Sequence, residues 1–249
     1  MMRRPNNPWI EMRSSRDRPT LRLFCFPCAG GSAQQYRSLA RNAPPSVEVC
    51  PIQLPGRLSR INDEPFRRCE PLARALLEAI APELDVPFAF FGHSLGTILA
   101  FEVVRELRRR GLRPQHLVVA ARIAPQAPLT RPPLHTLSQA EFLRVFQSRF
   151  QPLPPEILRE PELLALIVGT MQADFEVHET YAYRPEPPLD VPITAMGGLG
   201  DDLVSKEDLA MWCKQTTAPF ALHMLPGGHS FLLEDEQTFS RLLWTTLGV

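Results

Sequence analysis

Gly92-His93-Ser94-Leu95-Gly96 is the stretch from which the fold of this chain can be worked out. It follows a short apolar run, residues 88–91, and precedes residues 97–110, where apolar positions recur at helical spacing. A strand, a sharp turn and a helix, in that order, are the setting of a G-x-S-x-G turn that carries a nucleophile. Glycines suit this turn because a serine lifted above a sheet edge leaves no room for side chains beside it. The pattern favours a catalytic Ser94 over a structural serine in a glycine turn.

Other apolar runs along the chain are typical of buried strands, and helix-like segments separate them. Together with residues 88–91, the strand candidates are residues 21–26, 47–52, 117–121, 191–196 and 220–225. Helical segments are expected from Pro71, over 205–212 and over 234–243. Strands that alternate with helices indicate a parallel arrangement. The sequence therefore predicts an α/β fold with a mostly parallel central sheet flanked by helices.

One interval breaks this alternation, between the strand candidates that end at Ala121 and begin at Val191. It is about double the roughly 30 residues of a simple crossover. Proline-rich hinges separate two amphipathic segments in it, and the first of these opens with a capping-box signature at Ser138. We interpret residues 124–188 as a helical lid over the serine, in which Met171 and Phe175 bind substrate. The alternative is a helical elaboration without a gating role.

Length and charge limit the functions that the chain can have. Its 249 residues suit a single domain, expected over residues 21–249. Residues 1–20 carry five arginines and no apolar core, so we expect a disordered tail and no secretory signal. The formal net charge is zero, which argues against nucleic acid or an anionic membrane as partner. No run approaches the roughly 18 apolar residues of a membrane span.

The five cysteines are scattered along the chain. They indicate reduced thiols in a cytoplasmic protein and not a disulfide framework. Cys25-x-x-Cys28 stands without a second pair, and Cys25 falls inside a strand pattern, so a zinc or redox site is the weaker interpretation.

A serine nucleophile needs a base, and the base needs an acid that orients it. In an α/β sheet of this kind the order along the chain is serine, acid, histidine. His229 follows Gly227-Gly228 directly after the last strand candidate, where sites form in such sheets, and is the predicted base. The loop after the preceding strand supplies the acid, either Asp201 or Asp202.

The tetrahedral intermediate of acyl transfer needs N–H donors already in place. One donor is expected to be the backbone amide of Leu95, the residue after the nucleophile. The second should come from the loop after the first strand, where Ala29 is the choice and Cys28 the fallback.

With these residues in view, the sequence resembles the type II thioesterases of polyketide and nonribosomal peptide biosynthesis. Four stretches carry the resemblance, in the order of the family: residues 26–31 (Phe-Pro-Cys-Ala-Gly-Gly), residues 54–57 (Leu-Pro-Gly-Arg) with Arg60, residues 92–96, and residues 227–231 (Gly-Gly-His-Ser-Phe).

The resemblance implies an α/β-hydrolase fold with a helical lid and a Ser–His–Asp triad. It favours Asp201 as the acid, three residues before Val204, although Leu199 stands where the family often has another aspartate. It also places Cys28 where the family commonly has His, Tyr or Phe, in a position that shapes the acyl pocket.

The implied reaction is hydrolysis of acyl thioesters on the phosphopantetheine arm of carrier proteins, through an acyl-Ser94, as an editing step. The resemblance implies no metal or other cofactor, since the phosphopantetheine belongs to the carrier protein. We expect a discrete monomeric enzyme. The alternatives are a carboxylesterase or lipase that acts on free esters, and a non-catalytic binding protein of the same fold.

Overall fold

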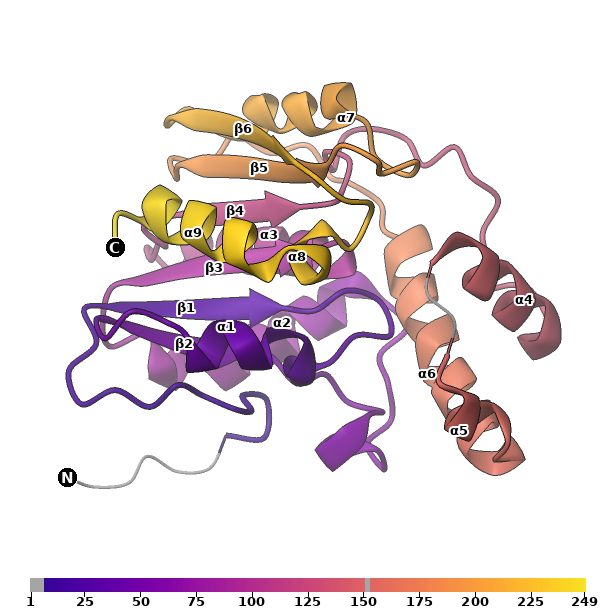
Figure 1. Ribbon diagram of the computed structural model, residues 1–249. Helices are drawn as coiled ribbons and strands as arrows, with labels where there is room; N and C mark the ends of the chain where they lie inside the picture. The colour runs from indigo at the N-terminus through magenta and orange to yellow at the C-terminus, as the bar shows by residue number, and fades with distance from the viewer. Residues whose placement is uncertain (1–6, 151–152) are drawn as a thin grey trace.

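The computed structural model describes residues 7–150 and 153–249, and within them a central sheet holds six parallel strands (Figure 1). They are β1 (Leu21–Phe26), β2 (Val47–Pro51), β3 (Phe88–His93), β4 (Leu117–Ala120), β5 (Ile193–Gly198) and β6 (Phe220–Leu225). Their order across the sheet is β2-β1-β3-β4-β5-β6, and every neighbouring pair is parallel. The predicted α/β architecture is confirmed.

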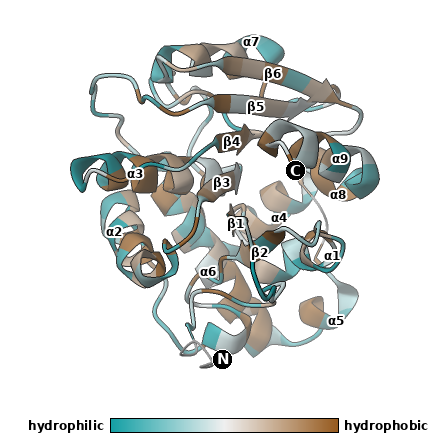
Figure 2. Cartoon of the chain, turned by 90° about the vertical axis from the view of Figure 1, so that its left-hand side faces the viewer, coloured by the Kyte–Doolittle hydropathy of each residue, from teal (hydrophilic) through white to brown (hydrophobic). Residues whose placement is uncertain are grey.

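Helices cover both faces of the sheet (Figure 1). One face packs on α1 (Arg37–Arg41), α8 (Phe231–Glu234) and α9 (Glu236–Leu247), and the other on α2 (Cys69–Ile80), α3 (Leu95–Arg109) and α7 (Lys206–Ala210). The alternation of side chains along a strand divides them between two hydrophobic cores. In β1, Leu23 and Cys25 belong to the first core, and Phe24 and Phe26 to the second. Figure 2 shows the hydrophobic strands between the helical layers.

The segment between β4 and β5 lies beyond the carboxyl ends of the strands (Figure 1). It contains α4 (Gln139–Arg149), α5 (Pro155–Leu158) and α6 (Pro161–Glu179). Ser138 begins α4 with the predicted capping box, reciprocated by Glu141. The two longer helices bury a separate apolar cluster around Phe142, Met171 and Phe175. The short α5 was not predicted, because four residues are too few to show a helical period.

Several boundaries differ from the sequence prediction. Strand β5 begins at Ile193, because Pro192 has no amide to donate to the sheet. The helix expected over 205–212 divides into α7 and the 3₁₀ helix η4 (Met211–Gln215). The closing helix is also divided, since the Asp235 carboxylate accepts the Thr238 amide and caps α9. The remaining 3₁₀ turns are η1 (Ala33–Tyr36), η2 (Leu58–Arg60) and η3 (Ala81–Glu83).

The chain before β1 differs from the disordered tail that was expected over residues 1–20. Residues 7–20 lie against the domain, while residues 1–6 are outside the described part. Ile10 is buried and forms an isolated bridge with Ile52, and the Arg60 guanidinium lies 4.1 Å from the centre of the Trp9 ring. Two of the arginines themselves bind the domain, since Arg13 pairs with Glu83 at 2.8 Å and Arg16 donates to the Ala43 carbonyl oxygen at 2.9 Å. The arginine-rich composition therefore did not indicate a disordered segment here.

None of the helices in the described part of the chain is long and apolar enough to cross a lipid bilayer.

Candidate active site

Ser94 stands at the turn between β3 and α3 in a strained backbone conformation. Its φ is +53° and its ψ −113°, in a region that residues with a side chain rarely adopt. The Ser94 amide donates to the carbonyl oxygen of Ala120 on β4 at 2.8 Å. A Cβ on Gly96 would overlap the carbonyl oxygen of Phe26, and one on Gly92 would overlap the backbone of Gly96. Gly96 is therefore required by the close approach of this turn to the end of β1, and Gly92 by the tightness of the turn itself.

His229 lies in the loop after β6 and contacts the serine. Its Nε2 is 3.1 Å from Ser94 Oγ, although the two residues are 135 positions apart. Its Nδ1 is 2.9 Å from Asp201 Oδ2. With the Nδ1 proton donated to the carboxylate, Nε2 is left to accept the serine proton, which is the arrangement that a general base needs.

Of the two adjacent carboxylates, Asp201 is the one that reaches the imidazole. Its side chain is completely buried, and its second oxygen accepts the Leu203 amide at 2.8 Å. Asp202 is exposed, and its backbone carbonyl accepts from Arg131. The structure thus places Asp201, and not Asp202, against the histidine, a choice that the residues alone left open.

The parallel pairing of β5 and β6 brings the acid loop and the histidine loop together. Beyond the ends of the strands, the Leu199 amide donates to Leu225 at 2.7 Å, and the Gly200 amide donates to Gly227 at 2.8 Å. These bonds continue the sheet pairing into the loops, so that Asp201 and His229 emerge side by side.

His93, the residue before Ser94, hydrogen-bonds to the loop of the base. It is fully buried, and its Nε2–H donates to the carbonyl oxygen of His229 at 2.8 Å. Its Nδ1 accepts from the Gln35 amide at 3.0 Å. Burial lowers the pKa of His93 to about 3, so the ring stays neutral and can make one bond of each kind. Gln35 was not predicted, because no pattern in the sequence links it to a residue 58 positions away.

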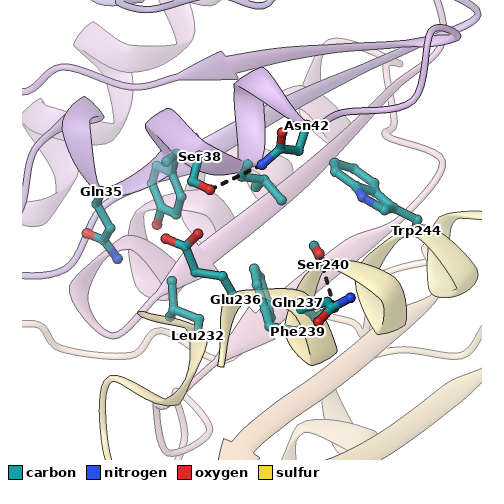
Figure 3. A pocket seen from close by; sticks show the side chains of 11 residues that line it. Gln35, Ser38, Asn42, Leu232, Glu236, Gln237, Phe239, Ser240 and Trp244 are labelled. Atoms are coloured by element: carbon teal, nitrogen blue, oxygen red, sulfur yellow. Dashed lines mark hydrogen bonds between the residues drawn. The ribbon is translucent and has the colours of Figure 1, made fainter. Parts of the chain in front are cut away.

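Gln35 also borders a second hollow, shown in Figure 3. This hollow of about 340 Å³ lies between η1–α1 and α8–α9, with Glu236, Phe239 and Trp244 on its other side. Gln35 lines both this hollow and the cavity beside Ser94.

A larger cavity of about 910 Å³ opens beside Ser94 and His229. All three residues predicted to bind substrate line it, Cys28 from the loop after β1 and Met171 and Phe175 from α6. Phe150 closes the cavity near the base, with its ring centre 5.8 Å from that of His229. A largely apolar space of this size is suited to a small molecule or an acyl chain.

In the loop after β1, some backbone amides donate hydrogen bonds within the protein and others do not. The Gly31 amide donates to Cys28 at 2.9 Å, and the Gly30 amide donates to the Asp174 carboxylate at 2.7 Å. Among the described residues, neither Ala29 nor Leu95 has an acceptor for its backbone amide. Both predicted oxyanion donors are therefore without a protein acceptor in the described part of the chain, and Ala29 also lines the cavity beside Ser94.

Cys28 does not supply a second nucleophile in this cavity. Burial raises the pKa of its thiol to about 11, so the reactive thiolate is not formed near neutral pH. Neither Cys28 nor Cys25 is in a disulfide. Within residues 7–150 and 153–249, no group of three or more His, Cys, Asp or Glu side chains is placed to hold a metal ion.

The other histidines after Ser94 have different surroundings. His223 lies on β6, and the remaining three each contact another side chain, in the pairs His116–Thr194, His135–Glu179 and His178–Arg122. In the described part of the chain, His229 is the imidazole that contacts Ser94.

Comparison with known proteins agrees with this geometry. Residues 21–244 match the family described as the thioesterase domain. The gramicidin S biosynthesis protein GrsT of Aneurinibacillus migulanus is 36% identical over 231 residues, which cover 92% of this chain and 90% of that protein.

Two solved structures are similar along almost their whole length. The type II thioesterase BorB from the borrelidin biosynthetic cluster has a TM-score of 0.83 at 31% identity, covering 97% of each chain. The thioesterase RedJ from the prodiginine pathway of Streptomyces coelicolor has a TM-score of 0.82 at 36% identity, covering 92% of this chain and 89% of RedJ.

Proposed function

This chain belongs to the thioesterase family, and we propose that Ser94, His229 and Asp201 are the triad with which it hydrolyses acyl thioesters. The protein is a hydrolase of the α/β-hydrolase fold, and similar proteins include GrsT of gramicidin S biosynthesis and the type II thioesterase BorB from the borrelidin biosynthetic cluster. The observation that carries the triad assignment is the chain of hydrogen bonds from Ser94 Oγ through the His229 imidazole to Asp201.

In the proposed reaction, Ser94 Oγ attacks the thioester carbonyl while its proton passes to His229 Nε2. Asp201 stabilises the imidazolium that forms. The amides of Ala29 and Leu95 hold the developing oxyanion. The C–S bond then breaks, and the leaving thiolate takes the proton from His229. Water, deprotonated by His229, attacks the acyl-Ser94 ester and releases the free acid and the serine hydroxyl.

The proposed substrate is an acyl group on the phosphopantetheine arm of a carrier protein. GrsT is named for gramicidin S biosynthesis, and BorB and RedJ come from natural-product pathways. The cavity supports an acyl substrate because Met171, Phe175 and Phe150 give it an apolar wall beside the nucleophile. We further propose that the protein acts in the cytoplasm, which its five free thiols support. We also propose that it needs no cofactor of its own, because Ser94, His229 and Asp201 suffice for acyl transfer to serine and hydrolysis.

The test compares one acyl group on a carrier protein with the same acyl group on a small oxygen ester. We expect the carrier thioester to have the higher kcat/KM. A serine-directed phosphonate should label the native protein and not the Ser94→Ala variant. Preference for the free ester, with indifference to the carrier, would support a carboxylesterase instead, and the absence of labelling in the native protein would exclude the acyl-serine mechanism.

A further inference from the structure

A buried ion pair joins lid helix α6 to the loop that follows β2. Arg57 Nη1 is 2.7 Å from Asp174 Oδ2, and Arg57 Nη2 is 2.8 Å from Asp174 Oδ1, so the pairing is bidentate. The side chain of Arg57 is 9% exposed and that of Asp174 is 3% exposed. A buried pair of this kind gives little or no net stability over an apolar pair, because removing two charges from water is costly. The pair is therefore better explained by the segments that it holds together than by a gain in stability.

Both members of the pair also bind the loop after β1. Asp174 Oδ2 accepts the Gly30 amide at 2.7 Å, and Arg57 Nη1 donates to the Gly31 carbonyl oxygen at 2.8 Å. The two side chains thus fix the peptide groups that directly follow Ala29, the proposed oxyanion donor.

Two neighbouring residues of α6 also contact the loop after β1 and the loop after β2. Thr170 Oγ1 donates to the carbonyl oxygen of Gly56 at 2.9 Å. The side chain of Met171 lies so close to Gly30 that a Cβ added there would be 3.1 Å from Met171 Cγ. Helix α6 therefore meets the β1 and β2 loops through consecutive turns of its surface, with Asp174 as the charged contact.

We propose that Arg57 and Asp174 are positioning residues, which orient the loop after β1 so that the Ala29 amide points at the developing oxyanion. This rests on the proposed function, because it assigns a cause to the geometry of that donor. Asp174 satisfies the Gly30 amide and Arg57 restrains the Gly31 carbonyl, which leaves the Ala29 amide free. Preorganised donors stabilise the transition state more than the bound substrate. Loss of the pair should therefore lower kcat and leave KM nearly unchanged.

Helix α6 also offers a matched control. Glu176, two residues after Asp174, accepts from Arg67 and Arg68 on the chain that follows the Arg57 loop. It is a second carboxylate–arginine link between the same two segments, but it does not contact the loop after β1. Asp174→Gln would change side-chain length as well as charge, so the isosteric changes are Asp174→Asn and Glu176→Gln.

The experiment measures kcat, KM and the affinity for a boronic acid that forms a tetrahedral adduct on Ser94. We expect Asp174→Asn to lower kcat about tenfold to hundredfold, with a parallel loss of boronate affinity and a KM within about threefold of native. Glu176→Gln should match the native protein in all three. Equal losses in both variants, a change confined to KM, or native values for Asp174→Asn would overturn the proposal.

A second variant keeps the test decisive if Asp174→Asn fails to fold. Replacing both partners, Arg57→Met with Asp174→Leu, removes both charges together and avoids leaving one of them buried alone. This double variant should fold and still lose kcat and boronate affinity, because the Gly30 amide has no acceptor. Native kcat in the folded double variant would overturn the proposal. The native enzyme measured alongside tests the proposed function separately, since failure of that function would abolish carrier-thioester hydrolysis without any substitution.

Discussion

Asp201 and Asp202 are adjacent in the chain, yet consecutive side chains leave the backbone in different directions. Only the carboxylate of Asp201 contacts the His229 imidazole, and it is buried without exposure to solvent. We therefore expect Asp201→Asn to lower kcat by about 10⁴, because an amide no longer selects the imidazole tautomer that accepts from serine. Asp202→Asn should change kcat less than about threefold. Steady-state hydrolysis of one acyl-carrier substrate checks both, and equal losses would contradict the assignment of the acid.

His93 links the pH dependence of stability to the site. Burial and the nearby His229 lower its pKa from 6.5 to about 3, so below pH 6.5 the unfolded chain binds a proton that the folded chain does not. The free energy of unfolding should therefore be unaffected by this group above pH 6.5 and should fall as the pH drops from 6.5 toward 3, by up to about 1.4 kcal/mol per pH unit.

Urea unfolding at a series of pH values measures this slope. The His93→Gln variant should be less stable than the native protein at neutral pH, because it alters a fully buried hydrogen-bonded group. Its stability should nevertheless fall less steeply on acidification. An identical slope in both proteins would show that another group is responsible.

At the scale of elements, helix α6 forms one wall of the acyl cavity. Met171 and Phe175 lie one turn apart on its buried side and both line the cavity. Replacing Met171 with Trp should shift the preference from long toward short acyl chains, because the added ring fills space that a chain would use. Turnover of a series of saturated acyl groups on one carrier protein measures the shift. An unchanged chain-length profile, in a variant that folds, would favour a helical elaboration without a role in binding.

The strands and the two residues at their ends could be predicted because their signals are local. An apolar run followed by G-x-S-x-G, or by Gly-Gly-His, contains strand, turn and functional side chain in consecutive residues. Asp174 and Gln35 could not be found in this way. Each acts through a contact with a distant segment, Asp174 with Gly30 and Gln35 with His93, and neither is set apart from other polar residues in an amphipathic pattern.

At the scale of the whole molecule, the chain before β1 belongs to the folded body. Ile10 is 7% exposed, and the Trp9 carbonyl accepts the Gln53 amide at 2.9 Å. We expect Ile10→Ala to lower the free energy of unfolding by about 2–4 kcal/mol, as for other buried aliphatic truncations. Urea unfolding followed by circular dichroism measures this. A loss below about 0.5 kcal/mol would indicate a loosely held tail, as the arginine-rich composition first suggested.

The contacts that make the site join parts of the chain that are far apart. Ser94 meets His229 across 135 positions, and Gly30 meets Asp174 across 144. Contacts of such separation form late in folding, because closing long loops costs entropy before it is repaid. A nascent or partly unfolded molecule would therefore have no hydrolytic power. The recovery of turnover during refolding should therefore lag behind the recovery of helical signal.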